Sequence, residues 1–214
     1  MSHDFVRVPI PKLKSSIREI KYQFFRRIIP QILWRYSPAT SFPAYAFVPG
    51  QHPHPRSDAR GHSYNCPPHV PAPLKPEHPE QSLDFCFAID LFNAGYYWEA
   101  HEIWEGLWIA HGRVGKVADF LKGLIKLAAA GVKAREGQAT GVYRHAKRSL
   151  ELLESIRDCQ ATHISSFCGI VLEPLMAHIR RLCEHPIVDT TSTVSGRAVL
   201  PIRLTLSHLD PPSQ

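Results

Sequence analysis

The chain has 214 residues, 44% hydrophobic and 21% charged, a balance typical of a soluble globular protein with one good core. Its five cysteines include no Cys-x-x-Cys pair, which argues against a disulfide framework and a zinc ribbon and favours a reducing cytoplasm. The net charge of +6 comes from scattered basic residues with no RNA-binding motif, so there is no clear nucleic-acid signal. No apolar run reaches the roughly 20 residues of a transmembrane segment, and no signal peptide is recognisable. We therefore predict a soluble cytoplasmic protein.

The first predicted element is an amphipathic helix from Lys12 to Tyr36, interrupted near Pro30. One side is apolar, and the rest is the most basic part of the chain, with Glu19 as its single acidic residue. Its basic residues are Lys12, Lys14, Arg18, Lys21, Arg26, Arg27 and Arg35. Two interpretations remain open: a membrane-surface or phosphate-binding helix, or a docking helix whose charges are simply solvated.

The segment from Ser37 to Pro79 holds most of the prolines and five of the 13 histidines, without a hydrophobic period. It is therefore predicted to be an extended arm. Its candidate metal ligands are His54, Asp58 and His62, which with His52 lie within eleven residues. The alternative is a linker of unusual composition, although a free linker would not need the apolar anchors Tyr45, Phe47 and Tyr64.

From residue 82 the hydrophobic residues recur at helical spacing, and no strand alternation competes with that pattern. Breaks are expected at 93–95, 111–116 and 135–138, and the second of them holds two glycines, which favour a helix end. The predicted helices are Ser82–Phe92, Tyr96–Ala110, Val117–Ala134, Ala139–Ser155 and about Val171–Glu184.

A short internal repeat suggests how these helices pair. The pattern Gly-x-Tyr-x-x-Ala begins at Gly95 and again at Gly141, each time near the opening of the second helix of a pair. Two stacked αα-hairpins follow from this, although three matching positions also arise by chance.

The C-terminal segment Ala198–Leu206 alternates apolar and polar residues, which predicts a short strand or an extended tail that Pro201 confines to an edge. The predicted fold is all-α: an antiparallel helical bundle of stacked αα-hairpins with a Pro/His-rich N-terminal arm and a short C-terminal extended tail. The expected divisions are 1–79 for the basic helix and arm, 80–186 for the bundle, and 187–214 for the tail.

The helix Tyr96–Ala110 carries the strongest candidate site, within the stretch NAGYYWEAHEIWEGLW. His101 and Glu105 are one turn apart on the flank of its apolar face, a spacing that can supply two ligands to one metal. Glu102 is expected to point towards solvent. The pattern is not the HExxH zinc signature, because position 105 is Glu, and a structural His–Glu hydrogen bond is the alternative. Both side chains are expected to be largely buried by Trp98, Trp104 and the helix Val117–Ala134.

This motif, with GLIKLAAA from Gly123 to Ala130, resembles the domain of unknown function family numbered 309, over about residues 83–157. The resemblance implies a small all-helical bundle with His101, Glu102 and Glu105 in its signature. It also implies the label that family carries, a predicted metal-dependent hydrolase without an assigned reaction.

Two functions are carried forward. In the first, the protein is a metal-dependent hydrolase acting on a small or anionic substrate. His101 and Glu105 bind an unidentified divalent metal, and His54, Asp58 or His62 of the arm completes its coordination. Glu102, Lys126 and His145 are its candidate catalytic residues, and no residue is assigned to an organic cofactor. In the second, the hairpins form a non-catalytic binding module for a peptide or small ligand. The two differ in whether the arm approaches the helical site, and the oligomeric state stays open.

Overall fold

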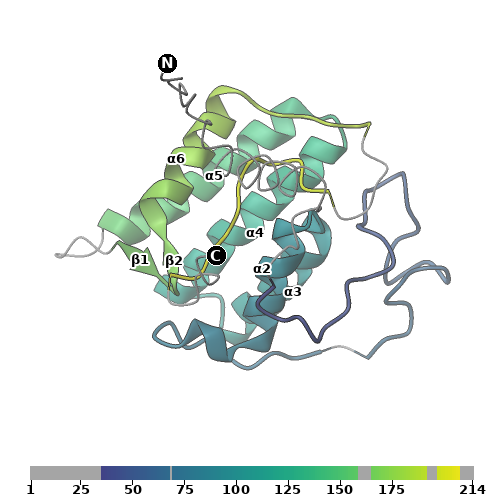
Figure 1. The fold of residues 1–214 in the computed structure, drawn as a ribbon, viewed down its shortest axis with the longest axis horizontal. Helices are drawn as coiled ribbons and strands as arrows, with labels where there is room; N and C mark the ends of the chain where they lie inside the picture. Colours follow the sequence, from purple (N-terminus) through teal and green to yellow (C-terminus); the bar gives the residue numbers. More distant parts are fainter. Residues whose placement is uncertain (1–34, 68, 159–164, 192–196, 208–214) are drawn as a thin grey trace, which may run out of the picture. The chain divides into compact units, whose positions relative to one another are not determined.

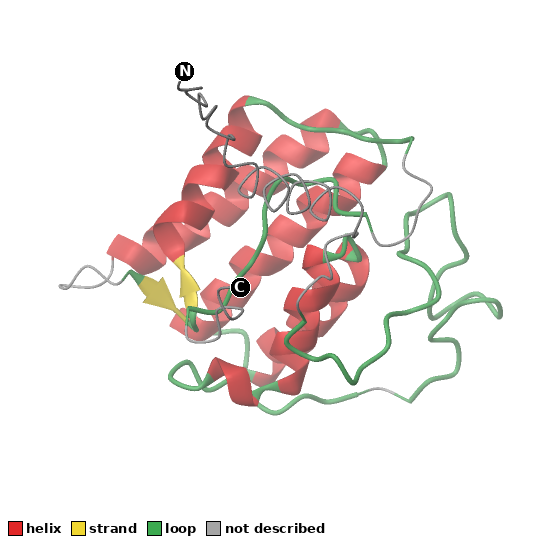
Figure 2. Ribbon diagram, viewed as in Figure 1, coloured by secondary structure: helices red, strands yellow, loops and turns green. Residues whose placement is uncertain are grey.

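A computed structural model describes residues 35–67, 69–158, 165–191 and 197–207, all within one structural unit that spans residues 35–214. The predicted basic helix, apart from its last two residues, lies outside this part of the chain. The described residues form five α-helices, and a short 3₁₀ helix, η1, precedes them (Figures 1 and 2). Their bounds are Pro79–Gln81 (η1), Leu83–Asn93 (α2), Tyr97–Ala110 (α3), Lys116–Arg135 (α4), Ala139–Asp158 (α5) and Leu172–Glu184 (α6). The prediction of an all-α bundle is confirmed.

Each helix from α2 to α6 packs against its neighbour in the chain, with α4 between α3 and α5 (Figure 1). Helix α4 thereby occupies the middle of the bundle. Trp104 of α3 and Phe120 of α4 are fully buried, and Trp104 packs 5.8 Å from the ring of Phe92 on α2. Burying an aromatic side chain of this size contributes about 2–3 kcal/mol, so the aromatic residues of α2, α3 and α4 stabilise the core strongly.

The turn between α2 and α3 follows from local sequence. Ser82 caps the start of α2, where its Oγ accepts a hydrogen bond from the backbone N of Phe85 at 3.2 Å. Gly95 ends the turn with φ of +81°, and a side chain there would also collide with the carbonyl of Arg197. Glycine is therefore required at position 95 both by backbone conformation and by close approach.

Residues 197–207 form the predicted extended tail, and no strand is assigned within them. Every second side chain is buried, as in a strand: Leu200, Ile202, Leu204 and Leu206. Side chains of the bundle replace the missing sheet partner. Asn93 donates to the Leu204 carbonyl and accepts from its N–H, both at 2.8 Å, and the Tyr97 hydroxyl accepts from the N–H groups of Val199 and Leu200, both at 2.9 Å. These bonds satisfy backbone groups that would otherwise be buried without partners.

One element was absent from the sequence prediction. Strands β1 (Ser166–Phe167) and β2 (Ile170–Val171) form an antiparallel hairpin just before α6. Cys168 and Gly169 between them both have positive φ, the backbone conformation of a tight two-residue hairpin turn. Two-residue strands are too short to show an alternating pattern, so hydrophobic periodicity could not detect them.

Candidate functional site

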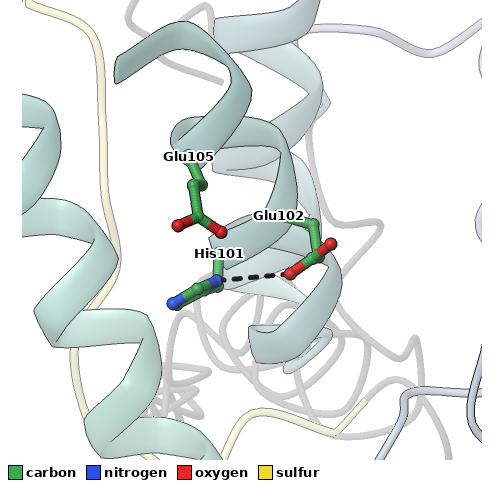
Figure 3. A group of neighbouring side chains, drawn as sticks. All are labelled: His101, Glu102 and Glu105. Atoms are coloured by element: carbon green, nitrogen blue, oxygen red, sulfur yellow. Dashed lines mark ion pairs between the residues drawn. The ribbon is translucent and has the colours of Figure 1, made fainter. Parts of the chain in front are cut away.

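Helix α3 brings three metal-ligating side chains together. His101, Glu102 and Glu105 each offer one ligand atom, and these atoms all lie within 4.8 Å of one another (Figure 3). His101 Nδ1 and Glu102 Oε1 are 3.7 Å apart, which is longer than a hydrogen bond. We call these three residues the α3 cluster. It is the one such group of three or more acidic, His or Cys side chains within the described ranges.

Two sequence expectations about the cluster need correction. His101 and Glu105 were expected to be largely buried, but both are half-buried, with the His101 side chain 26% exposed. Glu102 was expected to point away from the pair, but its side chain reaches the same group. A helical projection places Cβ atoms only. A glutamate side chain is long enough to turn towards an adjacent histidine and towards Glu105, three residues further on.

The imidazole of His101 is incompletely satisfied. Its Nδ1 atom is buried and has no hydrogen-bond partner among the described residues. A buried nitrogen without a partner costs about 1–3 kcal/mol, so such an atom calls for an explanation. A bound ligand is one, and the nearby Glu102 and Glu105 carboxylates make a cation the chemically suitable ligand.

Lys126 of α4 and His145 of α5 add basic groups from the neighbouring helices. His145 is half-buried, and burial lowers its pKa below the usual value of 6.5. The positive charges of Lys126, Lys133 and Arg144 lower it further, with a smaller effect of His101. The His145 imidazole is therefore neutral at pH 7 and able to accept a proton. Its electrostatic coupling to both Lys126 and His101 shows that α3, α4 and α5 contribute to one region.

The arm packs onto α3. Its contacts are on the side of the helix that carries Glu99, whereas the prediction required its histidines to reach the side of His101 and Glu105. The carboxylate of Glu99 accepts a hydrogen bond from the backbone N of Phe47 at 2.8 Å, and its Oε1 lies 3.2 Å from His62 Nε2. Glu99 is only 5% exposed. No role was predicted for Glu99, which lies on the side of α3 away from the predicted apolar face. The arm covers that side, and the signal available beforehand was that Tyr45 and Phe47 needed a surface to pack on.

The arm's predicted ligands therefore lie outside the α3 cluster. His62 is engaged with Glu99, and Asp58 forms an ion pair with Arg60 at 2.8 Å within its own loop. Hydrogen bonds from Arg60 lower the pKa of Asp58 to about 2. His54 packs its ring against Trp98, with centroids 5.6 Å apart. The arm residue that does reach the cluster is Arg56, whose Nε lies 3.8 Å from Glu102 Oε2.

The tryptophans of α3 divide into two kinds. Trp104 is core, as expected for a tryptophan on an apolar helix face. Trp98 is half-buried beneath Phe47 and His54 of the arm, and Trp108 is half-buried beside the cations of Arg113 and Lys122. Trp98 thus connects the arm to the helix.

The fold and the site together define a small helical-bundle protein with a His/Glu cluster on its second full helix. Residues 85–145, which contain the whole cluster, match a family model described as Domain of unknown function (DUF309). The match confirms the resemblance seen in the sequence. A search of curated proteins finds no match to the chain. Within the described residues, none of the helices combines the length and apolar character needed to cross a membrane.

Proposed function

We propose that the α3 cluster binds a divalent metal ion and that the protein is a metal-dependent hydrolase acting on a small anionic substrate. The observation that carries this proposal is the convergence of His101, Glu102 and Glu105 ligand atoms within 4.8 Å. One imidazole nitrogen and two carboxylate oxygens form a donor set suited to Zn²⁺, Mn²⁺ or Fe²⁺.

The geometry fits a metal with small adjustments. Ligand atoms at bonds of about 2.0–2.2 Å around one ion lie roughly 3–4 Å apart, slightly closer than in the structure. The three side chains are half-buried and free to close over that distance. Binding would also satisfy the buried Nδ1 of His101, if that nitrogen is the one that ligates.

The remaining residues have roles that suit hydrolysis. A bound divalent ion acts as a Lewis acid and lowers the pKa of a coordinated water, to about 7 for Zn²⁺. His145 is neutral at pH 7 and accepts a proton, and Lys126 offers a positive charge to an anionic substrate group. In this proposal Glu102 is a metal ligand. The arm packs beside the site and supplies no ligand to the metal.

Metal titration of chelator-treated protein, prepared without a histidine tag, tests the binding step. Isothermal titration with Zn²⁺ and Mn²⁺ should show one site per chain in the wild type. His101→Ala and Glu105→Gln should each weaken binding by at least about 100-fold, since loss of a supporting residue alone costs 10–100-fold. His178→Ala, on the exposed side of α6, is the matched control and should leave binding unchanged.

Two further variants separate the alternatives. His54→Ala should keep the wild-type metal affinity, because His54 packs on Trp98; a loss equal to that of His101→Ala would make the arm a source of ligands. Lys126→Met and His145→Ala should keep the metal and lose hydrolysis of p-nitrophenyl esters or phosphates. Absence of metal binding in the wild type would refute the proposal and favour the non-catalytic ligand-binding module.

A further inference from the structure

The arm segment 54–63 is a closed, rigid loop. Its ends are joined by backbone hydrogen bonds from Asp58 N to His54 O at 3.2 Å and from Ser63 N to Pro55 O at 3.1 Å. Gly61 packs so tightly that a Cβ there would overlap the carbonyl oxygens of His54 and Pro55. His54 Nδ1 also accepts from the backbone N of Arg56, at 3.3 Å. A loop closed in this way holds Arg56 in a fixed place, unlike a free linker.

Buried contacts fix this loop on α3. His62 and Phe47 both bind the Glu99 carboxylate, and His54 packs on Trp98. Glu99 is one helical turn before Glu102, so the docked loop runs beside the α3 cluster. His54 and His62 of the arm thus have a positioning role that does not require either of them to ligate a metal.

The result of this positioning is a cation at the edge of the cluster. The Arg56 guanidinium lies 3.8 Å from Glu102, a separation typical of a loose ion pair, and the Arg56 side chain is 51% exposed. Exposed pairs of this kind are weak, so the guanidinium can readily exchange Glu102 for another anion. When Glu102 ligates a metal, its negative charge is shared with the ion and its hold on Arg56 weakens further.

The charges of the loaded site then favour a dianion. Glu102 and Glu105 balance a divalent ion, and Lys133 is paired with Glu136 at 2.6 Å. Arg56 from the arm, 3.8 Å from Glu102, and Lys126 from α4, whose charge acts on His145, then supply positive charge near the cluster. Two cations, one of them a planar guanidinium, match the charge and the bidentate geometry of a phosphate group better than those of a single carboxylate.

We infer that Arg56, with Lys126, binds a phosphate group beside the α3 cluster, so that the substrates are phosphomonoesters. This inference rests on the proposed function, because it places the anion next to a bound metal. It assigns to the arm a binding role for which the sequence analysis offered only metal ligation.

The test measures binding of Mn²⁺ alone and then of inorganic phosphate to the Mn²⁺-loaded full-length protein, by isothermal titration at low ionic strength. Arg56→Gln should keep Mn²⁺ affinity within about threefold of wild type and weaken phosphate binding at least tenfold. The matched control is Arg60→Gln in the same loop, which is paired with Asp58 and should change neither affinity. Acetate at the same concentration should bind at least tenfold more weakly than phosphate.

The outcomes separate the two proposals. Wild-type protein that binds Mn²⁺ but not phosphate, or that binds acetate as tightly, overturns this inference and leaves the metal site standing. Equal phosphate affinity in Arg56→Gln and wild type overturns the role of Arg56. Failure of the wild type to bind any divalent ion overturns both the proposed function and the inference built on it.

Discussion

Glu99 and Glu102 stand one turn apart on α3, yet their surroundings differ in kind. Glu99 is buried and bound by a backbone N–H and by His62, so its charge is held by the fold itself. Glu102 is half-exposed, with an arginine at 3.8 Å and a histidine at 3.7 Å as its charged neighbours. Both contacts are longer than hydrogen bonds. Both donors of Glu99 reach its Oε1, while its Oε2 is buried with no hydrogen-bond partner among the described residues. A carboxylate held by protein donors contributes to stability, whereas one left with loose contacts remains available to a ligand.

The sharpest test of this contrast is to remove each carboxylate in turn. Glu99→Ala should lower the free energy of unfolding by about 3 kcal/mol, because it leaves the Phe47 N–H unpaired and detaches His62. Glu102→Ala should change it by less than about 0.5 kcal/mol, as is usual at exposed sites. Urea denaturation measures both. Metal affinity should fall strongly in Glu102→Ala and little in Glu99→Ala. Equal loss of unfolding free energy in the two variants would contradict the distinction between the two carboxylates.

A bound metal should stabilise the fold through its bonds to the α3 cluster, which includes the loosely held Glu102. At a free concentration 100 times its Kd, a metal that binds only the folded state adds about 2.7 kcal/mol of stability. Thermal unfolding with and without Mn²⁺ should show this rise in wild type and in His178→Ala. In His101→Ala the metal-dependent shift should disappear, and its persistence would place the metal elsewhere.

The C-terminal tail supplies a second example of a buried polar side chain held by hydrogen bonds to the backbone of a distant segment. Asn93 forms two hydrogen bonds with the backbone of Leu204, so Asn93→Ala should cost about 2 kcal/mol by leaving a buried N–H and C=O unpaired. Hydrogen exchange at residues 199–206 should accelerate in this variant. The exposed Gln51→Ala is the control, and the same cost there would show that the tail bonds contribute little.

The smallest expected effect concerns the pH response of the functional region. The pKa of His145 is lowered in the folded state, so protonation opposes folding, and stability should fall as the pH drops below the unfolded value of about 6.5. Histidine NMR titration should place the His145 midpoint below 6.5, and Lys126→Met should raise it. The variant His145→Gln has no imidazole to protonate at this position. Its free energy of unfolding should therefore fall less than that of the wild type as the pH drops below 6.5. A normal midpoint would contradict both the burial of His145 and the nearby positive charges of Lys126, Lys133 and Arg144.

The sequence alone was enough to predict the helices of the bundle, their order and the proximity of His101 and Glu105. Local rules decide these features: apolar periodicity sets a helix such as Lys116–Arg135, glycine at 95 sets a turn, and helical spacing places His101 near Glu105. The alternating burial of residues 200–206 was also readable, because it depends on local side-chain direction.

Tertiary structure decided which side chains meet. Glu99 became buried because the arm, more than 30 residues earlier in the sequence, packs over its side of α3. The tail has the alternating burial of a strand, but side chains of Asn93 and Tyr97, and not a neighbouring strand, bind its backbone at residues 199, 200 and 204. Arg56 approached Glu102 only because the docked loop carries it there. Such contacts join residues distant in the chain, and hydrophobic periodicity and helical spacing describe only local neighbours.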